Sequence, residues 1–226
     1  MNKSQLLGFL LILVLPVVPI HATTIEIDTV PLSGITLELL NGTAESISLN
    51  GSVEYHVTFP FSEGSATDGD SNGREEVPAE MVVLSLTGTG TMGSVVIGLS
   101  TTRLSTGLIE EQVNNYTGIL DVPPFVPGPS YVDSFFDVFF EIAIGGNVYH
   151  NEVPAHIAGV WSHKPSTQDE FGNMFNSMNP VALFDKSNVP TGLVLRPTPI
   201  IPIPSSLWLI GSGLLGLIGI ARKKAS

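Results

Sequence analysis

The chain has 226 residues, of which only 13% are charged, and it carries a formal net charge of −12 with no cysteine. About 175 residues remain once the two terminal segments are set aside, which is enough for one buried core. The lack of cysteine excludes disulfides, thiolate zinc sites, cysteine nucleophiles and a lipid-modified cysteine.

The acidic residues are concentrated in the central part of the chain. All twenty-one lie between Glu26 and Asp185, and residues 23–199 contain only five basic residues, so this part has a net charge of −16. Because phosphate binding needs a clustered cationic surface, we expect no nucleic-acid partner. The acidity favours cations, or polysaccharides bridged by cations, as partners; the alternative is that it only keeps the protein soluble.

The amino-terminal segment is typical of a signal peptide. Lys3 precedes an apolar run over residues 6–18, and the segment closes with small Ala22. We predict a signal peptide over residues 1–22, export through the Sec translocon and cleavage after Ala22. An uncleaved anchor is the alternative, but the run is shorter than the roughly 20 residues that a membrane span needs, and Pro16 interrupts it.

The carboxy-terminal segment predicts a membrane helix. Pro202-Ile203-Pro204 is followed by an apolar run over residues 207–221 and then by Arg222-Lys223-Lys224. A helix over residues 200–221 would be about 33 Å long, enough to cross the hydrocarbon layer. We expect one transmembrane helix over residues 205–221, with the basic cluster in the cytoplasm. A plain single-pass anchor would have the same pattern.

The order of parts in IPIPSSLWLIGSGLLGLIGIARKK resembles the PEP-CTERM sorting tail of exosortase substrates, and the resemblance covers residues 200–226. Its motif residues here are Pro202, Ile203, Pro204, Arg222, Lys223 and Lys224. Ile203 stands where the family usually has Glu, which resembles a Pro-x-Pro variant of the signal. The resemblance implies cleavage by an exosortase, a membrane cysteine protease. It also implies anchoring in the inner membrane before processing, and a cell-surface or extracellular location afterwards.

The first third of the central part alternates apolar and polar residues from Ile25 to Phe59, as strands with one buried face do. Asn41-Gly42 and Asn50-Gly51 fall between the apolar runs and predict two tight hairpin turns, giving an antiparallel meander. A polar, glycine-rich stretch over residues 62–76 predicts a long loop. The proline-rich stretch over residues 122–129 predicts a connector.

The most apolar stretch, Ser134 to Ile144, predicts one central strand, with alternate residues from Phe136 to Ile144 on one face. Shorter strands are expected after it, for a total of nine or ten. The best helix candidate is Thr106 to Tyr116. The pattern predicts an all-β fold, an antiparallel β-sandwich or double sheet, over residues 23–199. This body also resembles uncharacterised β-domains found with such tails, from which no function follows.

One motif in the body has the spacing of a calcium loop. Asp68, Asp70 and Asn72 alternate before Gly73, and Glu76 takes the ninth position of an EF-hand count. The twelfth position is Ala79 rather than Glu, so Glu80 or a distant carboxylate would have to supply the bidentate ligand. We regard Asp68, Asp70, Asn72 and Glu76 as candidate calcium ligands; the alternative is a solvated loop. No other cofactor is expected.

Catalytic motifs are not evident in the sequence. His150, His156 and His163 have intervals that do not converge on a zinc ion, and Ser100 lacks the glycine that a nucleophile elbow requires. The leading hypothesis is therefore a non-enzymatic structural or binding β-domain of the cell surface or extracellular matrix, with exopolysaccharide as a partner. A calcium-dependent carbohydrate-binding module is the alternative. A secreted glycan hydrolase is the second alternative, since its two acids can be distant in sequence.

Overall fold

The computed structural model describes residues 23–198, which fold into eleven strands, one α-helix and one short 3-10 helix. The strands are β1 (Thr24–Asn41), β2 (Thr43–Phe59), β3 (Glu76–Gly90), β4 (Gly93–Leu99), β5 (Ser105–Glu111), β6 (Val132–Val138), β7 (Phe140–Ile144), β8 (Asn147–Asn151), β9 (Ala155–Trp161), β10 (Val181–Phe184) and β11 (Pro190–Pro197). The helices are α1 (Gln168–Met174) and η1 (Phe175–Ser177). The predicted signal peptide with Ala22, the Pro202–Pro204 motif, the apolar run over 205–221 and the basic end over 222–224 lie outside the described residues.

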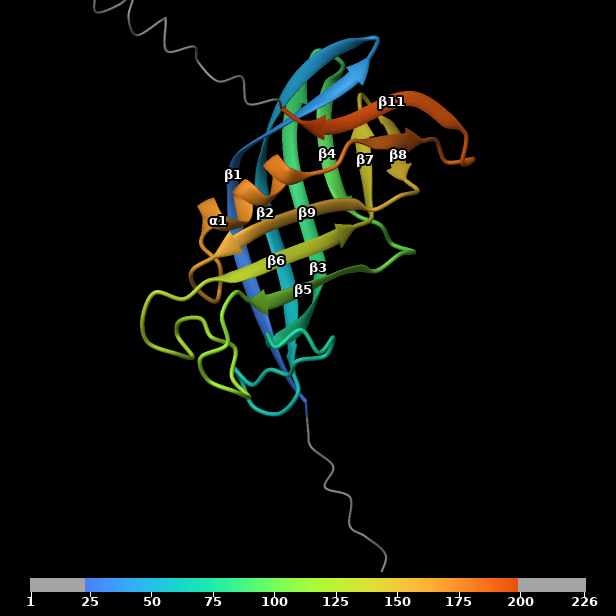
Figure 1. The fold of residues 1–226 in the computed structure, drawn as a ribbon. Coiled ribbons are helices and arrows are strands. Elements are labelled where there is room, and N and C mark those ends of the chain that lie inside the picture. Colours follow the sequence, from blue (N-terminus) through green and yellow to red (C-terminus); the bar gives the residue numbers. More distant parts are fainter. Residues whose placement is uncertain (1–22, 199–226) are drawn as a thin grey trace, which may run out of the picture.

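All strand pairings are antiparallel and form one sheet in the order β2-β1-β11-β10-β8-β7-β4-β3-β5-β6-β9. An additional pairing of β2 with β3 closes eight of these strands into a ring. Figure 1 shows β1, β2 and β3 running along the length of the domain, with β5, β6 and β9 crossing in front of them. The sheet therefore folds over and packs its inner face against itself.

Strand β3 belongs to both halves of the domain. Residues 76–81 pair with β5, whereas residues 85–90 pair with β4. The opposite edge of β3 pairs with β2 over residues 79–89. A single strand thus changes partner midway along one edge and links the ring to the β5-β6-β9 extension.

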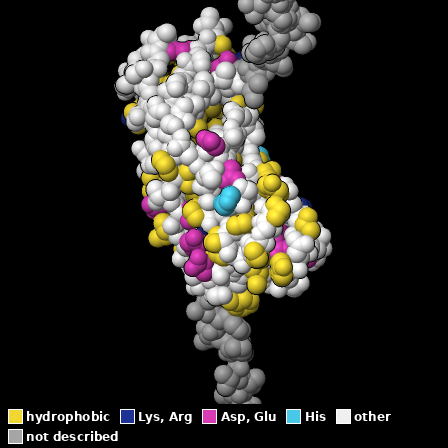
Figure 2. Space-filling model, turned by 90° about the vertical axis from the view of Figure 1, so that its left-hand side faces the viewer, with side chains coloured by type: hydrophobic (Ala, Val, Ile, Leu, Met, Phe, Trp, Pro, Cys, Tyr) yellow, Lys and Arg dark blue, Asp and Glu magenta, His cyan; other side chains and the backbone are white. Residues whose placement is uncertain are grey.

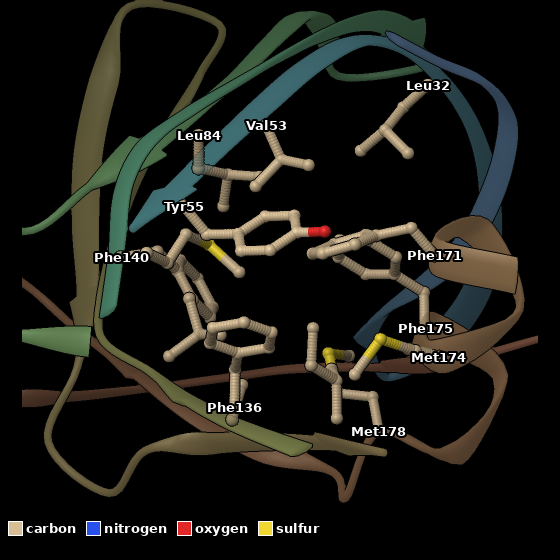
Figure 3. Packing of buried hydrophobic residues seen from close by; sticks show 14 of the residues in the cluster. Leu32, Val53, Tyr55, Leu84, Phe136, Phe140, Phe171, Met174, Phe175 and Met178 are labelled. Carbon is tan, nitrogen blue, oxygen red and sulfur yellow. The ribbon is translucent and has the colours of Figure 1, made fainter. Parts of the chain in front are cut away.

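Aromatic rings from distant segments meet in the core. The ring of Tyr55 lies 5.7 Å from that of Phe136, 5.6 Å from that of Trp161 and 5.6 Å from that of Phe171, between ring centroids. All four side chains are fully buried. In Figure 3, Phe171 and its helical neighbours point from one side toward Tyr55 and Phe136 on the other. Helix α1 therefore fills the opening between β1 and β9 with apolar side chains.

The expectation of an all-β antiparallel fold is confirmed, although hydrogen bonding does not divide the strands into two separate sheets. The Asn41-Gly42 turn is also confirmed, with Gly42 at φ +74°. The turn at Asn50-Gly51 is wrong, because these residues lie inside β2. A Cβ on Gly51 would come 1.7 Å from the carbonyl oxygen of Ser85, so glycine is needed here for the close approach of β3.

Two further expectations are corrected. Residues 134–144 do not form one strand, because the chain breaks at Phe139 and its two parts, β6 and β7, pair with different strands. The amide of Phe139 donates to the side-chain oxygen Oγ of Ser105 at 2.9 Å rather than to the backbone of a neighbouring strand. Residues 106–116 are not helical, because most of them form β5. The helix is α1, which begins with a capping box of Thr167 and Glu170. Within residues 23–198, no helix has the length and apolar character that a bilayer span requires.

Candidate functional site at the loop end of the domain

Two long loops, residues 60–75 and 112–131, meet at the end of the domain where β1 begins (Figure 1). We call this region the loop end. The amide of Leu120 donates to the carbonyl of Gly64 at 2.8 Å, and the amide of Ala66 donates to the carbonyl of Gly118 at 3.2 Å. A β-bridge between Ser65 and Ile119 joins the same segments. The two loops are therefore held side by side by their backbones.

The predicted calcium motif forms a tight loop. Asp68 accepts hydrogen bonds from the amides of Asn72 and Gly73, each at 3.0 Å. Gly73 has φ +86° and Ser71 has φ +64°, the left-handed values that such a turn requires. The carboxylate of Asp68 is thus occupied by amides of its own loop.

Three carboxylates converge beside this loop. One oxygen from each of Asp70, Glu76 and Glu110 lies within 4.8 Å of the others. Glu76 and Glu110 face each other directly across the β3–β5 pairing. Of the four candidate ligands, the structure brings together Asp70 and Glu76. Glu110 joins them as a third carboxylate, and no local pattern in the sequence identified it.

Nearby donors already contact this acidic group. The side-chain amide of Asn72 donates to Asp70 Oδ2 at 3.1 Å and to Glu110 Oε1 at 2.6 Å. The guanidinium of Arg74 lies 2.7 Å from Glu110 Oε2.

Burial raises the pKa of Glu76 above 4.5, and the neighbouring charges of Asp70, Glu110 and Asp68 raise it further. The all-oxygen donor set suits a hard divalent cation such as Ca²⁺.

A second group of carboxylates lies inside the loop end. Glu75, Glu111 and Asp121 are all buried. Glu111 accepts hydrogen bonds from the amide of Glu75 at 2.9 Å and from that of Asp121 at 3.2 Å. Glu75 accepts from the amide of Gly118 at 2.5 Å, and Asp121 accepts from that of Tyr116 at 3.2 Å. Burial, followed by the charges of Asp121 and Glu75, raises the pKa of Glu111. These side chains hold backbone amides of residues 115–121 within the second loop.

The histidines do not form a metal site among the described residues. His150 Nε2 lies 3.0 Å from Glu152 Oε1, and His156 Nδ1 lies 2.8 Å from Asp137 Oδ1. His163 contacts the hydroxyl of neighbouring Ser162 at 2.7 Å. Within residues 23–198, Asp70, Glu76 and Glu110 are the one group of three potential metal-binding side chains whose ligand atoms all lie within 4.8 Å of one another.

Comparison with known proteins gives little further information. No protein-family model matches the chain, and no curated protein matches it. Among solved structures, the chain is similar to DynF from the dynemicin biosynthesis pathway of Micromonospora chersina. The sequence identity is 16% and the TM-score 0.49, and the match covers 77% of this chain and 75% of that one.

Proposed function

We propose that the chain is exported through the Sec translocon, processed at its carboxy-terminal tail by an exosortase-type protease, and displayed at the cell surface or in the extracellular matrix as a non-enzymatic binding domain. The observation that carries this proposal is the order of parts along the chain. A basic start and an apolar run precede an acidic domain without cysteine, and a Pro-x-Pro motif, an apolar run and a basic end follow it. We assign the domain to the β-sandwich class, with two layers of strands. This compact fold suits a module displayed on a surface.

The positions of the two ends of the domain support this arrangement. Thr24 begins β1 at the loop end, whereas Pro197 pairs with Leu37, thirteen residues further along the same strand. At roughly 3.3 Å per residue, about 40 Å separates these two points. If the tail holds the protein at the membrane, the loop end is the part of the domain that faces away from it.

Fractionation of cells and sequencing of the protein ends test the proposal. The mature chain should begin at Thr23, be found in the envelope or the medium, and lose its tail only in cells that contain an exosortase. Replacing both Pro202 and Pro204 by Ala should prevent tail removal, whereas Ser206→Ala should leave it unchanged. A cytosolic chain that keeps residues 1–22 would refute export.

A calcium-dependent binding module is a second candidate function. It is favoured by the convergence of Asp70, Glu76 and Glu110 within 4.8 Å. Calcium binding to the folded state should raise the melting temperature of the full chain by mass action. Asp70→Asn and Glu110→Gln should abolish this rise, whereas Asp169→Asn, on the exposed side of α1, should retain it. Identical melting curves in calcium and in chelator would exclude this candidate.

A further inference from the structure

The exposed aromatic side chains of residues 23–198 all lie in the two loops of the loop end. Among residues 23–198, three aromatic residues are classed as exposed, namely Phe61 (47%), Tyr116 (53%) and Tyr131 (49%). Phe61 lies in the first loop of the loop end, Tyr116 in the second, and Tyr131 at the close of the second. Figure 2 shows hydrophobic side chains gathered on the lower part of one face, near this end, with acidic side chains among them. Large exposed rings in one region are a feature of binding surfaces.

Backbone contacts keep these rings on the same end of the domain. The amide of Phe61 donates to Ser65 Oγ at 3.0 Å, and Ser65 pairs with Ile119, which in turn donates to the carbonyl of Tyr116 at 3.3 Å. The carbonyl of Tyr131 accepts from the amide of Gln112 at 3.0 Å. Hydrogen bonds therefore connect the segments that carry Phe61 and Tyr116, and Tyr131 is bonded to the residue at which the second loop begins.

Buried carboxylates also hold the loop that carries Tyr116. Asp121, only 1% exposed, accepts a hydrogen bond from the amide of Tyr116 and is itself held by Glu111, which is fully buried. A ligand that contacts Tyr116 therefore meets a loop whose backbone is already ordered. Binding then costs less conformational entropy than binding to a mobile loop would.

The charges at the loop end restrict the class of ligand that could bind there. Asp70, Glu76, Glu110 and Asp133 lie at the same end, and the nearby cation Arg74 is paired with Glu110 and Asp133. This negative surface repels polyanions, including nucleic acid, acidic polysaccharide and anionic lipid. A neutral sugar has an apolar C–H face that packs on an aromatic ring, and its hydroxyl groups donate hydrogen bonds to carboxylates.

We propose that Tyr116 and Tyr131, together with Phe61, form a platform at the loop end that binds neutral polysaccharide. The proposal deepens the proposed function, on which it rests, by assigning the ligand class and the surface that takes it. The platform lies on the part of the domain that faces away from a membrane-held tail. Tyrosine suits this role because it offers a large, rigid and amphipathic contact area with few rotatable bonds.

Binding of the full-length chain to polysaccharides tests the platform, in a detergent whose head group is not a sugar. The probes are cellulose, starch and mannan as neutral glycans, alginate as an acidic one, and phosphatidylcholine vesicles as a lipid surface. We expect retention on at least one neutral glycan, with little change when sodium chloride is raised to about 0.5 M. Tyr116→Ala and Tyr131→Ala should each weaken binding about tenfold. Tyr116→Phe, which keeps the ring, and Leu104→Ala, an exposed residue outside the two loops, should bind as the wild type does.

Several results would overturn the platform. These are failure of the wild type to bind any of the three neutral glycans, retention only by alginate or by vesicles, or equal binding by the Tyr116→Ala and Tyr131→Ala variants. Thermal melting identifies variants that fold, and Tyr116→Leu, which keeps apolar bulk without the ring, replaces the alanine variant if that one unfolds. A protein that reaches the surface but binds no neutral glycan would refute the platform alone. A cytosolic protein would refute the proposed function, whatever it binds.

Discussion

The hydroxyl oxygen of Ser177 lies 2.7 Å from the amide nitrogen of Ala158 and 2.8 Å from its carbonyl oxygen. Ser177 thereby takes the place that a neighbouring strand would have beside β9, the last strand of the sheet. Along the same edge, the amide of His156 donates to Asn179 Oδ1 at 2.6 Å and the amide of Ser162 donates to Glu170 Oε1 at 2.6 Å. Side chains of the α1–η1 region thus satisfy an edge that would otherwise be open to pairing with other chains.

Replacing Ser177 by Ala should lower the free energy of unfolding by about 1–2 kcal/mol, because two backbone groups of Ala158 lose their partner. Denaturant titration measures this change. Ser187→Ala is the matched control, since the Ser187 side chain is exposed and makes no hydrogen bond among the described residues. Equal stability of the two variants would show that Ser177 does not protect the edge.

Replacing Lys164 by Met should destabilise the domain strongly. The ammonium group of Lys164 is buried, contacts Asp28, and lies 2.9 Å from Glu26 Oε2. Its loss leaves the buried carboxylate of Asp28 without a counter-charge, at a cost of about 3–5 kcal/mol. The double variant Lys164→Met, Asp28→Asn should recover part of this loss. Lys186→Met, at an exposed lysine without an ion pair among residues 23–198, should change the free energy of unfolding by less than about 0.5 kcal/mol.

The carboxylate of Glu170 should make stability fall in acid. Burial acts to raise its pKa, but hydrogen bonds from Thr167 and Ser162 outweigh burial and lower the pKa below 4.5. A lowered pKa in the folded state stabilises the protein above pH 4.5, and this stabilisation is lost as the pH falls through the folded-state pKa.

The wild type should therefore exceed Glu170→Gln in melting temperature at pH 7, and the difference should shrink as the pH falls below 4.5. Glu26 and Glu111 have raised pKa values, so their effect on the pH dependence of stability has the opposite sign. Both residues are present in the wild type and in the variant, so their contributions cancel in the difference between the two melting temperatures. Asp169→Asn controls for a change of charge in the first turn of α1. A difference that does not vary with pH would contradict the assignment.

Replacing Gly51 by Ala should disrupt the β2–β3 pairing, since the added Cβ would lie 1.7 Å from a backbone oxygen of Ser85. Backbone cannot move aside as a flexible side chain can, so we expect a loss of more than about 3 kcal/mol or no folded protein. Gly98→Ala in β4 is the control, because its Cβ would lie 3.6 Å from the nearest backbone oxygen, an ordinary contact. Chemical denaturation of the two variants measures the free energy of unfolding of each, and similar values would contradict the prediction.

Much of the fold could be predicted because apolar alternation records which face of a strand is buried. From Phe136 to Ile144, every second side chain is buried as predicted, even though the chain breaks at Phe139 and changes partner. The alternation does not record which strand lies alongside. For that reason the double pairing of β3 and the closure of the ring could not be found from the sequence.

The two Asn-Gly pairs illustrate the same limit. At Asn41-Gly42 glycine supplies a positive φ angle for a turn, whereas at Asn50-Gly51 it makes room for a carbonyl from a strand more than thirty residues away. The identical dipeptide serves two needs, and only the distant contact distinguishes them. Glu110 was missed at the acidic group for a similar reason, because β5 brings it opposite Glu76 across the sheet.

The separation of Thr24 from Pro197 along the axis of β1 also determines how the domain would respond to mechanical load. A pull between the loop end and the tail acts along β1, β2 and β3, whose hydrogen bonds lie across the direction of force. The interstrand hydrogen bonds would therefore be loaded in shear and would have to break together rather than one after another. The three long strands would thus resist tension between the loop end and the tail.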